Sequence, residues 1–182
     1  MGFFLCKELS VDNNPSHNTP NETESKTKDQ DGEEINNTFK QLPILIAPKI
    51  NLKNQGLPLI PDELYKMANP QDVVEINLEK NFIPFISSNF EIFNNLVTLK
   101  LNQNAFKTVP PPIYNCGLVN IQLLFLNNNE IDELPDLSNL VHLKQLYLQN
   151  NKISNNKIEN LDKLSSLIVL NLGQNNLDQI PP

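Results

Sequence analysis

The sequence contains no arginine, only two cysteines, two histidines and five glycines, and no long apolar run. The 14 basic residues are all lysines and the formal net charge is -7, so the clustered basic footprint of a nucleic-acid-binding protein is missing. Apolar runs such as residues 123–126 fall far short of the roughly 18 residues that cross a bilayer. We therefore expect neither a nucleic-acid partner nor a membrane span.

Residue types that catalyse reactions or hold metals are scarce. Cys6 and Cys116 form no C-x-x-C pair, which argues against a disulfide framework or a structural zinc site and fits a reducing compartment. His17 and His142 lie far apart, and the isolated glycines form no phosphate-binding loop. We predict no catalytic residue, no metal, no cofactor, and a cytoplasmic location.

Residues 1–38 differ in composition from the rest of the chain. They are rich in Ser, Thr, Asn and Pro, and they carry eight acidic residues against three lysines. Such a stretch cannot bury enough apolar surface to offset the entropy lost on ordering. The sequence therefore predicts a disordered acidic tail over 1–38, followed by one folded domain over 39–182.

The first residues permit one targeting signal. Gly2 stands at the acceptor position for N-myristoylation and Cys6 stands where that motif has Ser or Thr, although Phe3 is a bulky neighbour for the acceptor. The apolar piece 3–6 is shorter than the apolar region of a secretory signal, about 7 to 15 residues. A weak lipid anchor on Gly2 stays open, and secretion is not expected.

From about residue 47 the chain repeats one pattern, L-x-x-L-x-L-x-x-N-x-L. Six copies begin 22 to 26 residues apart, at 47–57, 73–83, 96–106, 121–131, 143–153 and 167–177. The L-x-L alternation predicts a short strand in each copy, with two side chains in a core and the one between them on a surface. Apolar residues about three positions apart, over 134–143 and 158–167, predict short helical or 3-10 turns between the copies.

This pattern resembles the leucine-rich repeat family over nearly everything after the tail. The resemblance implies an α/β solenoid, a right-handed superhelix with a short-stranded parallel sheet on its concave face. The x-I/L-P that follows the asparagine is similar to intracellular, Ras-suppressor-like repeats, and copies four to six look like the phosphatase-regulatory subfamily. No polar cap follows the sixth copy, so we expect truncation at the C-terminus or self-association through that end.

One asparagine recurs at the end of each strand after the first copy. Its side chain can both donate to and accept from backbone groups that the turn leaves unpaired. The sequence therefore predicts a structural ladder of five asparagines: Asn81, Asn104, Asn129, Asn151 and Asn175.

The outward strand positions align in rows across the six copies. The central row reads Asn51, Asn77, Lys100, Phe125, Tyr147, Asn171, and the row before it reads Lys49, Glu75, Thr98, Leu123, Gln145, Val169. An apolar patch with amides at its rim is typical of a partner site. We predict that a protein binds at Leu123, Phe125, Tyr147 and Val169, with Asn127 and Gln149 at the rim. The alternative is that the two aromatic rings pack on each other without a partner.

These features favour a binding module rather than an enzyme. We expect a scaffold or adaptor of intracellular signalling that holds a protein on its concave face and catalyses no reaction. The alternatives are a regulatory subunit of a protein phosphatase, the N-terminal repeat arm of a larger signalling enzyme, or a lipid-anchored structural protein.

Overall fold

The computed structural model describes residues 49–115, 117–154, 158 and 160–179 of the chain. The predicted tail over 1–38, the acylation motif at Gly2 and Cys6, and residue Cys116 lie outside the described residues. The start of the folded domain at residue 39 lies outside them too, so these four points stay predictions.

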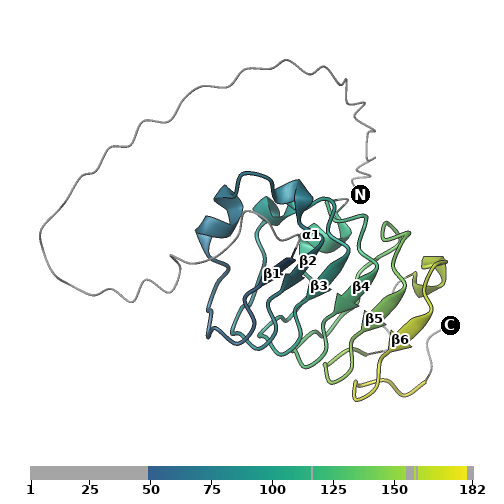
Figure 1. Cartoon of the computed structure of the whole chain (residues 1–182). Coiled ribbons are helices and arrows are strands. Elements are labelled where there is room, and N and C mark those ends of the chain that lie inside the picture. The colour runs from purple at the N-terminus through teal and green to yellow at the C-terminus, as the bar shows by residue number, and fades with distance from the viewer. Residues whose placement is uncertain (1–48, 116, 155–157, 159, 180–182) are drawn as a thin grey trace, which may run out of the picture. The chain divides into compact units, whose positions relative to one another are not determined.

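Six strands of three residues each form a single parallel sheet in the order β1-β2-β3-β4-β5-β6. The strands are β1 (Lys49–Asn51), β2 (Glu75–Asn77), β3 (Thr98–Lys100), β4 (Leu123–Phe125), β5 (Gln145–Tyr147) and β6 (Val169–Asn171). Figure 1 shows them side by side, one strand for each copy of the repeat. The parallel sheet of short strands predicted from the repeat is confirmed.

The middle residue of every strand points into the core. Leu124 and Leu146 pair in register and are completely buried, and Leu126 and Leu148 two positions later are equally buried. Each coil of the chain thus covers the apolar edge of the coil before it, as expected for stacked repeats. Leu170, at the same position in β6, is 39% exposed because no further described coil covers it.

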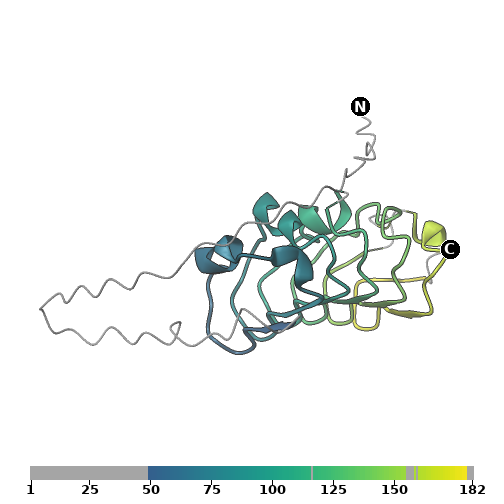
Figure 2. The ribbon, with the colours of Figure 1, turned by 45° about the horizontal axis from the view of Figure 1, so that its top comes forward.

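Short helices lie in the segments that connect one strand to the next. They are η2 (Asp62–Lys66), η3 (Pro70–Asp72), η4 (Ser88–Ile92), α1 (Pro111–Tyr114) and η6 (Leu161–Lys163). Figure 2 shows these coiled ribbons on the side of the coils away from the strands. In the described ranges no helix exceeds five residues, and none could cross a bilayer.

The short turns expected over 134–143 take the form of two single 3-10-type turns and not of a continuous helix, with the amides of Leu140 and Leu143 donating to the carbonyls of Leu137 and Leu140 at 2.8 and 2.9 Å. The amide of Ser138 donates to Oδ1 of Asp136 at 2.8 Å, which is an Asx turn that competes with helical bonding. Leu134 also forms an isolated parallel bridge with Ile158 in the next coil, which holds its backbone extended. Apolar spacing alone did not reveal these two competing interactions.

After each strand the chain turns through one residue in the left-handed region. The φ angles lie between 57° and 59° at Asn54, Lys80, Gln103, Asn128, Asn150 and Gln174. Three of the six are asparagines, the residue type other than glycine that visits this region most readily. The next residue in copies two to six is an asparagine of the predicted ladder.

Each ladder asparagine joins its own coil to the preceding one. Oδ1 of Asn129 accepts from the amide of Phe106 at 3.2 Å, and Nδ2 donates to the carbonyls of Leu101 at 3.1 Å and Leu126 at 2.9 Å. Asn81, Asn104, Asn151 and Asn175 repeat this arrangement in their coils. These side chains therefore satisfy backbone groups that the turn leaves without partners.

A second set of side-chain bonds joins the coils just before the strands. Nδ2 of Asn95 donates to the carbonyl of Gln71 at 3.1 Å, and Nδ2 of Asn120 donates to that of Asn94 at 2.9 Å. In the sixth copy the hydroxyl of Ser166 donates to the carbonyl of Val141 at 2.7 Å. The fifth copy has the exposed His142 at this position.

Replacing His142 with asparagine is expected to raise the free energy of unfolding by about 0.5 to 1 kcal/mol. The new amide would lie opposite the carbonyl of Val119, which occupies the place that Asn94 and Val141 have in their coils. Urea denaturation followed by circular dichroism measures the change. His142→Ala is the control, and equal midpoints for the two variants would contradict the expectation.

Candidate functional site

The solvent side of the six strands, called the sheet face below, carries the predicted rows in the predicted register. Lys100 pairs with Phe125, and Phe125 pairs with Tyr147. Leu123 and Val169 lie on either side of Gln145 in the neighbouring row. The structure therefore brings the four predicted apolar residues together over β4, β5 and β6.

The two aromatic rings on the sheet face lie flat against each other. The centroids of Phe125 and Tyr147 are 4.8 Å apart and the ring planes differ by 3°. The hydroxyl of Tyr147 donates to Oε1 of Gln145 at 3.1 Å, which fixes the direction of the ring. Both residues stay partly exposed, so the stack presents a rigid, apolar surface to solvent.

The polar rim continues the sheet beyond the strands. The carbonyls of Asn127 and Gln149 accept from Gln103 and Asn128 in their neighbouring coils, both at 3.0 Å, so their side chains form a third row beside the aromatic stack. Within the described part of the chain, Oε1 of Gln149 is buried and has no hydrogen-bond partner. Because this oxygen is shielded from solvent, the Gln149 side chain would have to turn outward before a bound molecule could donate to it.

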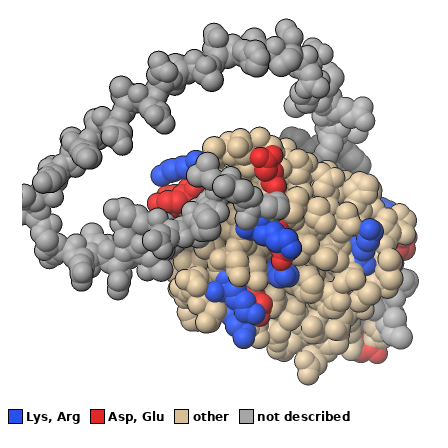
Figure 3. Space-filling model, viewed as in Figure 1, with Lys and Arg blue, Asp and Glu red and all other residues tan. Residues whose placement is uncertain are grey.

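The other half of the sheet face, over β1 to β3, is charged. Glu75 accepts from Lys49 at 3.0 Å and from Lys100 at 2.6 Å, and Glu79 pairs with Lys53 at 2.8 Å. In Figure 3 the charged atoms of this face gather toward its β1 end. The hydrogen bonds from Lys100 and then Lys49 hold the pKa of Glu75 below its ordinary value.

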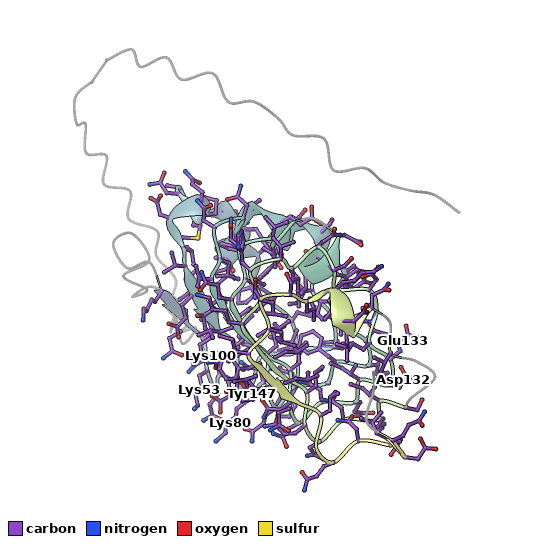
Figure 4. The ribbon with its side chains drawn as sticks, turned by 90° about the vertical axis from the view of Figure 1, so that its right-hand side faces the viewer. Lys53, Lys80, Lys100, Asp132, Glu133 and Tyr147 are labelled. Carbon is purple, nitrogen blue, oxygen red and sulfur yellow. The ribbon has the colours of Figure 1, made fainter. Side chains whose placement is uncertain are left out.

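The acidic loop residues Asp132 and Glu133 lie away from the sheet face (Figure 4). Figure 4 shows Lys53, Lys100 and Tyr147 on one side of the ribbon, and Asp132 and Glu133 on the opposite side. Across the described ranges, no group of His, Cys, Asp and Glu side chains has an arrangement that could hold a metal ion. The sheet face thus offers packing and hydrogen bonding, and the acidic loop residues lie away from it (Figure 4).

The sequence interpretation missed a second group of exposed apolar side chains beside the turns of the first two coils. Leu59, Phe82 and Phe85 are 49%, 70% and 58% exposed. Leu59 and Phe85 occupy equivalent positions, where copies three and four have Thr108 and Glu133, so the fold does not require apolar residues there. Aligning the copies beyond the strands, and not only within them, would have found this group.

No protein-family model matches the chain. Podocan of Mus musculus is 35% identical over 99 residues, which cover 52% of this chain and 15% of podocan. Osteomodulin of Rattus norvegicus is 29% identical over 152 residues, 80% of this chain and 34% of osteomodulin. The protein roco10 of Dictyostelium discoideum, whose name describes an inactive serine/threonine-protein kinase, is 28% identical over 147 residues, 79% of this chain and 5% of roco10.

Solved structures also resemble the repeat unit. A leucine-rich repeat protein of Leptospira interrogans matches with a TM-score of 0.62 and 27% identity, over 72% of this chain and 32% of the other. The leucine-rich repeat ectodomain of the Arabidopsis receptor kinase HAESA, in complex with an IDA peptide hormone ligand, matches with a TM-score of 0.51 and 26% identity. That match covers 60% of this chain and 20% of the ectodomain.

The predicted cytoplasmic location is wrong by this comparison. Podocan, osteomodulin, keratocan and lumican are secreted extracellular matrix proteins. The scarcity of cysteine indicates only that the coils need no disulfide, and it does not determine the compartment.

The expected intracellular subtype, Ras-suppressor-like or phosphatase-regulatory-like, finds no support in these relatives. The chain spans 15% of podocan and 34% of osteomodulin.

Proposed function

We propose that this chain, which is a leucine-rich repeat protein, binds another protein on its sheet face and catalyses no reaction. The apolar patch of Leu123, Phe125, Tyr147 and Val169 is the proposed anchor of the complex. The observation that carries the proposal is the rigid aromatic stack, exposed on a face that is otherwise polar or charged.

The fold does not require apolar residues at these positions. The residues aligned with Phe125 and Tyr147 in β1, β2 and β3 are Asn51, Asn77 and Lys100, and those coils form equally regular strands. Exposed aromatic side chains cost solubility unless a partner covers them, and aromatic residues dominate the energy of many protein interfaces.

The similar proteins support a binding role. The HAESA ectodomain carries a peptide hormone in its structure, and podocan and lumican are non-enzymatic leucine-rich repeat proteins. By analogy, this chain would recognise a protein or a protein segment. A role in signal transduction, as an adaptor or as a phosphatase regulator, is a finer form of the same proposal.

The similarity to roco10 favours one alternative, in which these repeats are one arm of a larger protein. Sequencing of the full-length transcript tests it. An open reading frame that continues into a kinase domain would support the arm, and a stop codon directly after Pro182 would refute it.

Self-association is a second kind of partnership that the last described coil permits. Ile168 is 78% exposed and Leu170 is 39% exposed. A second copy that covers this apolar edge would bury both side chains. Sedimentation velocity at rising protein concentration measures such association, and a constant sedimentation coefficient would refute it.

The double variant Phe125→Ala with Tyr147→Ala is expected to lose partner binding without loss of fold. Both side chains lie on the sheet face, so their removal leaves the core intact but takes away the proposed anchor. The measurement compares the proteins that the immobilised wild-type chain and the variant retain from cell extract and culture medium of the source organism, with identification by mass spectrometry.

Phe85→Ala provides the matched control, because Phe85 is an exposed aromatic residue that lies away from the sheet face. Proteins retained by wild type and by Phe85→Ala, but not by the double variant, are the expected partners. Equal recovery by all three chains would place the binding site elsewhere.

A further inference from the structure

The charge pattern of the sheet face deepens the proposed function, on which this inference rests. We infer that the partner contributes an extended segment that crosses the strands and carries a carboxylate two to four residues from an apolar side chain. The carboxylate would contact Lys100, and the apolar side chain would lie on the patch of Leu123, Phe125, Tyr147 and Val169.

Lys100 lies at the border between the two halves of the face. In register it follows Asn77 of β2 and precedes Phe125 of β4, and its side chain is 31% exposed. Its ammonium group already contacts Glu75 at 2.6 Å, but Glu75 also accepts from Lys49 at 3.0 Å. Two cations therefore share one carboxylate, and one of them, Lys100, lies on the strand next to the aromatic stack.

The charged half has more positive than negative side chains. The outward side chains of this half include three lysines, Lys49, Lys53 and Lys100, against two glutamates, Glu75 and Glu79. The other half, over β4 to β6, carries no charged side chain at its strand positions. An incoming carboxylate would balance the excess cation, while a basic segment would meet unfavourable charge.

Strand spacing sets the separation of the two groups in the partner. Lys100 is one strand from Phe125 and two strands from Tyr147, which corresponds to about 5 and 10 Å at about 4.8 Å per strand. An extended segment advances about 3.3 Å per residue and directs alternate side chains to the same side. Positions i and i+2, about 6.6 Å apart, are the same-side pair nearest to the spacing of Lys100 and Phe125, and positions i and i+4, about 13 Å apart, are within reach of Tyr147 only if the long Lys100 side chain extends toward the carboxylate. The carboxylate and the apolar side chain are therefore expected first at i and i+2, and next at i and i+4.

A library of random 16-residue peptides displayed on phage, selected on the immobilised full chain, tests the inference. The expected result is enrichment of Asp or Glu two or four residues from Phe, Tyr, Trp or Leu. A synthetic copy of the most enriched peptide is then titrated by fluorescence anisotropy, at low and high salt, against wild type and against Lys100→Gln and Glu75→Gln.

The two variants should change affinity in opposite directions. Lys100→Gln removes the cation and is expected to weaken binding by about three- to tenfold and to reduce its salt dependence. Glu75→Gln removes the competing carboxylate and is expected to tighten binding by about threefold, because Lys49 and Lys100 are then free for the ligand. Glu130→Gln and Lys152→Gln alter a similar ion pair, 2.8 Å long, away from the strands and should leave the affinity unchanged.

Three results would overturn the inference: no enriched peptide, enriched peptides without the acidic pattern, or equal affinities of wild type and Lys100→Gln. The proposed function fails separately, if the double variant of Phe125 and Tyr147 retains the partners of the wild type. Loss of partners in that variant with no effect of Lys100→Gln would keep the sheet face as the site and refute the acidic segment.

Discussion

Replacing Leu146 with alanine is expected to lower the free energy of unfolding by about 3 kcal/mol. Leu146 is completely buried in β5, between Leu124 and Leu170 of the neighbouring strands. The substitution leaves a cavity in a core that the coils on both sides help to form, so neither coil can close over it without losing contacts of its own. Urea denaturation followed by circular dichroism measures the loss.

Leu170→Ala is the matched control for this prediction. It makes the same change at the same position of the next coil, where the side chain is 39% exposed. Because water already reaches part of Leu170, we expect a loss of only about 1 kcal/mol. Equal losses for the two variants would contradict the view that each coil is buried by the coil that follows it.

Replacing Asn129 with alanine is expected to cost about 3 kcal/mol as well, by a different mechanism. The amide of Phe106 loses its acceptor, and the carbonyls of Leu101 and Leu126 lose a donor. Asn129 is 8% exposed, so water cannot readily replace the missing side chain. The same denaturation experiment measures this change.

Two further variants separate the hydrogen bonds of Asn129 from its volume. Asn129→Asp keeps the acceptor for Phe106 but loses the donor bonds to the carbonyls of Leu101 and Leu126, and it should be nearly as unstable as the alanine variant. Asn127→Ala removes a half-exposed asparagine for which the structure gives no side-chain hydrogen bond among the described residues, and it should have little effect. An unshifted midpoint for Asn129→Ala would contradict the structural role of the ladder.

The strands and their register followed from the sequence because one spacing determines both. The asparagine after each of the strands β2 to β6 bonds to the preceding coil, so copies aligned on that asparagine also align their strands. For this reason the rows that place Phe125 beside Tyr147 could be written down from the repeat alone, and the structure pairs them in that register. The fold class is confirmed by the similar solved structures.

The remaining features depend on contacts that the repeat pattern does not encode. Glu75 contacts both Lys49 and Lys100, whose side chains come from the two neighbouring strands. The repeat aligns these strands, but it does not determine which way their long side chains extend. The bonds of Asn95 and Asn120 lie outside the conserved spacing of the strand motif, in segments whose lengths vary between copies. The location of the protein was predicted from its composition. Composition limits which interactions can stabilise the fold, but it does not determine the compartment in which the protein works.

Among the described residues each coil forms its hydrogen bonds with the adjacent coils, and the core of the last described coil is partly open to solvent at Leu170, so we expect the described stack to open first at β6. Amide protons of β6 should therefore exchange with solvent before those of β5 and β4, in steps that follow the partial exposure of Leu170. The proposed anchor residues lie on these same three coils. A bound molecule would then stabilise the coils that open most readily, and it would slow the exchange of their amide protons.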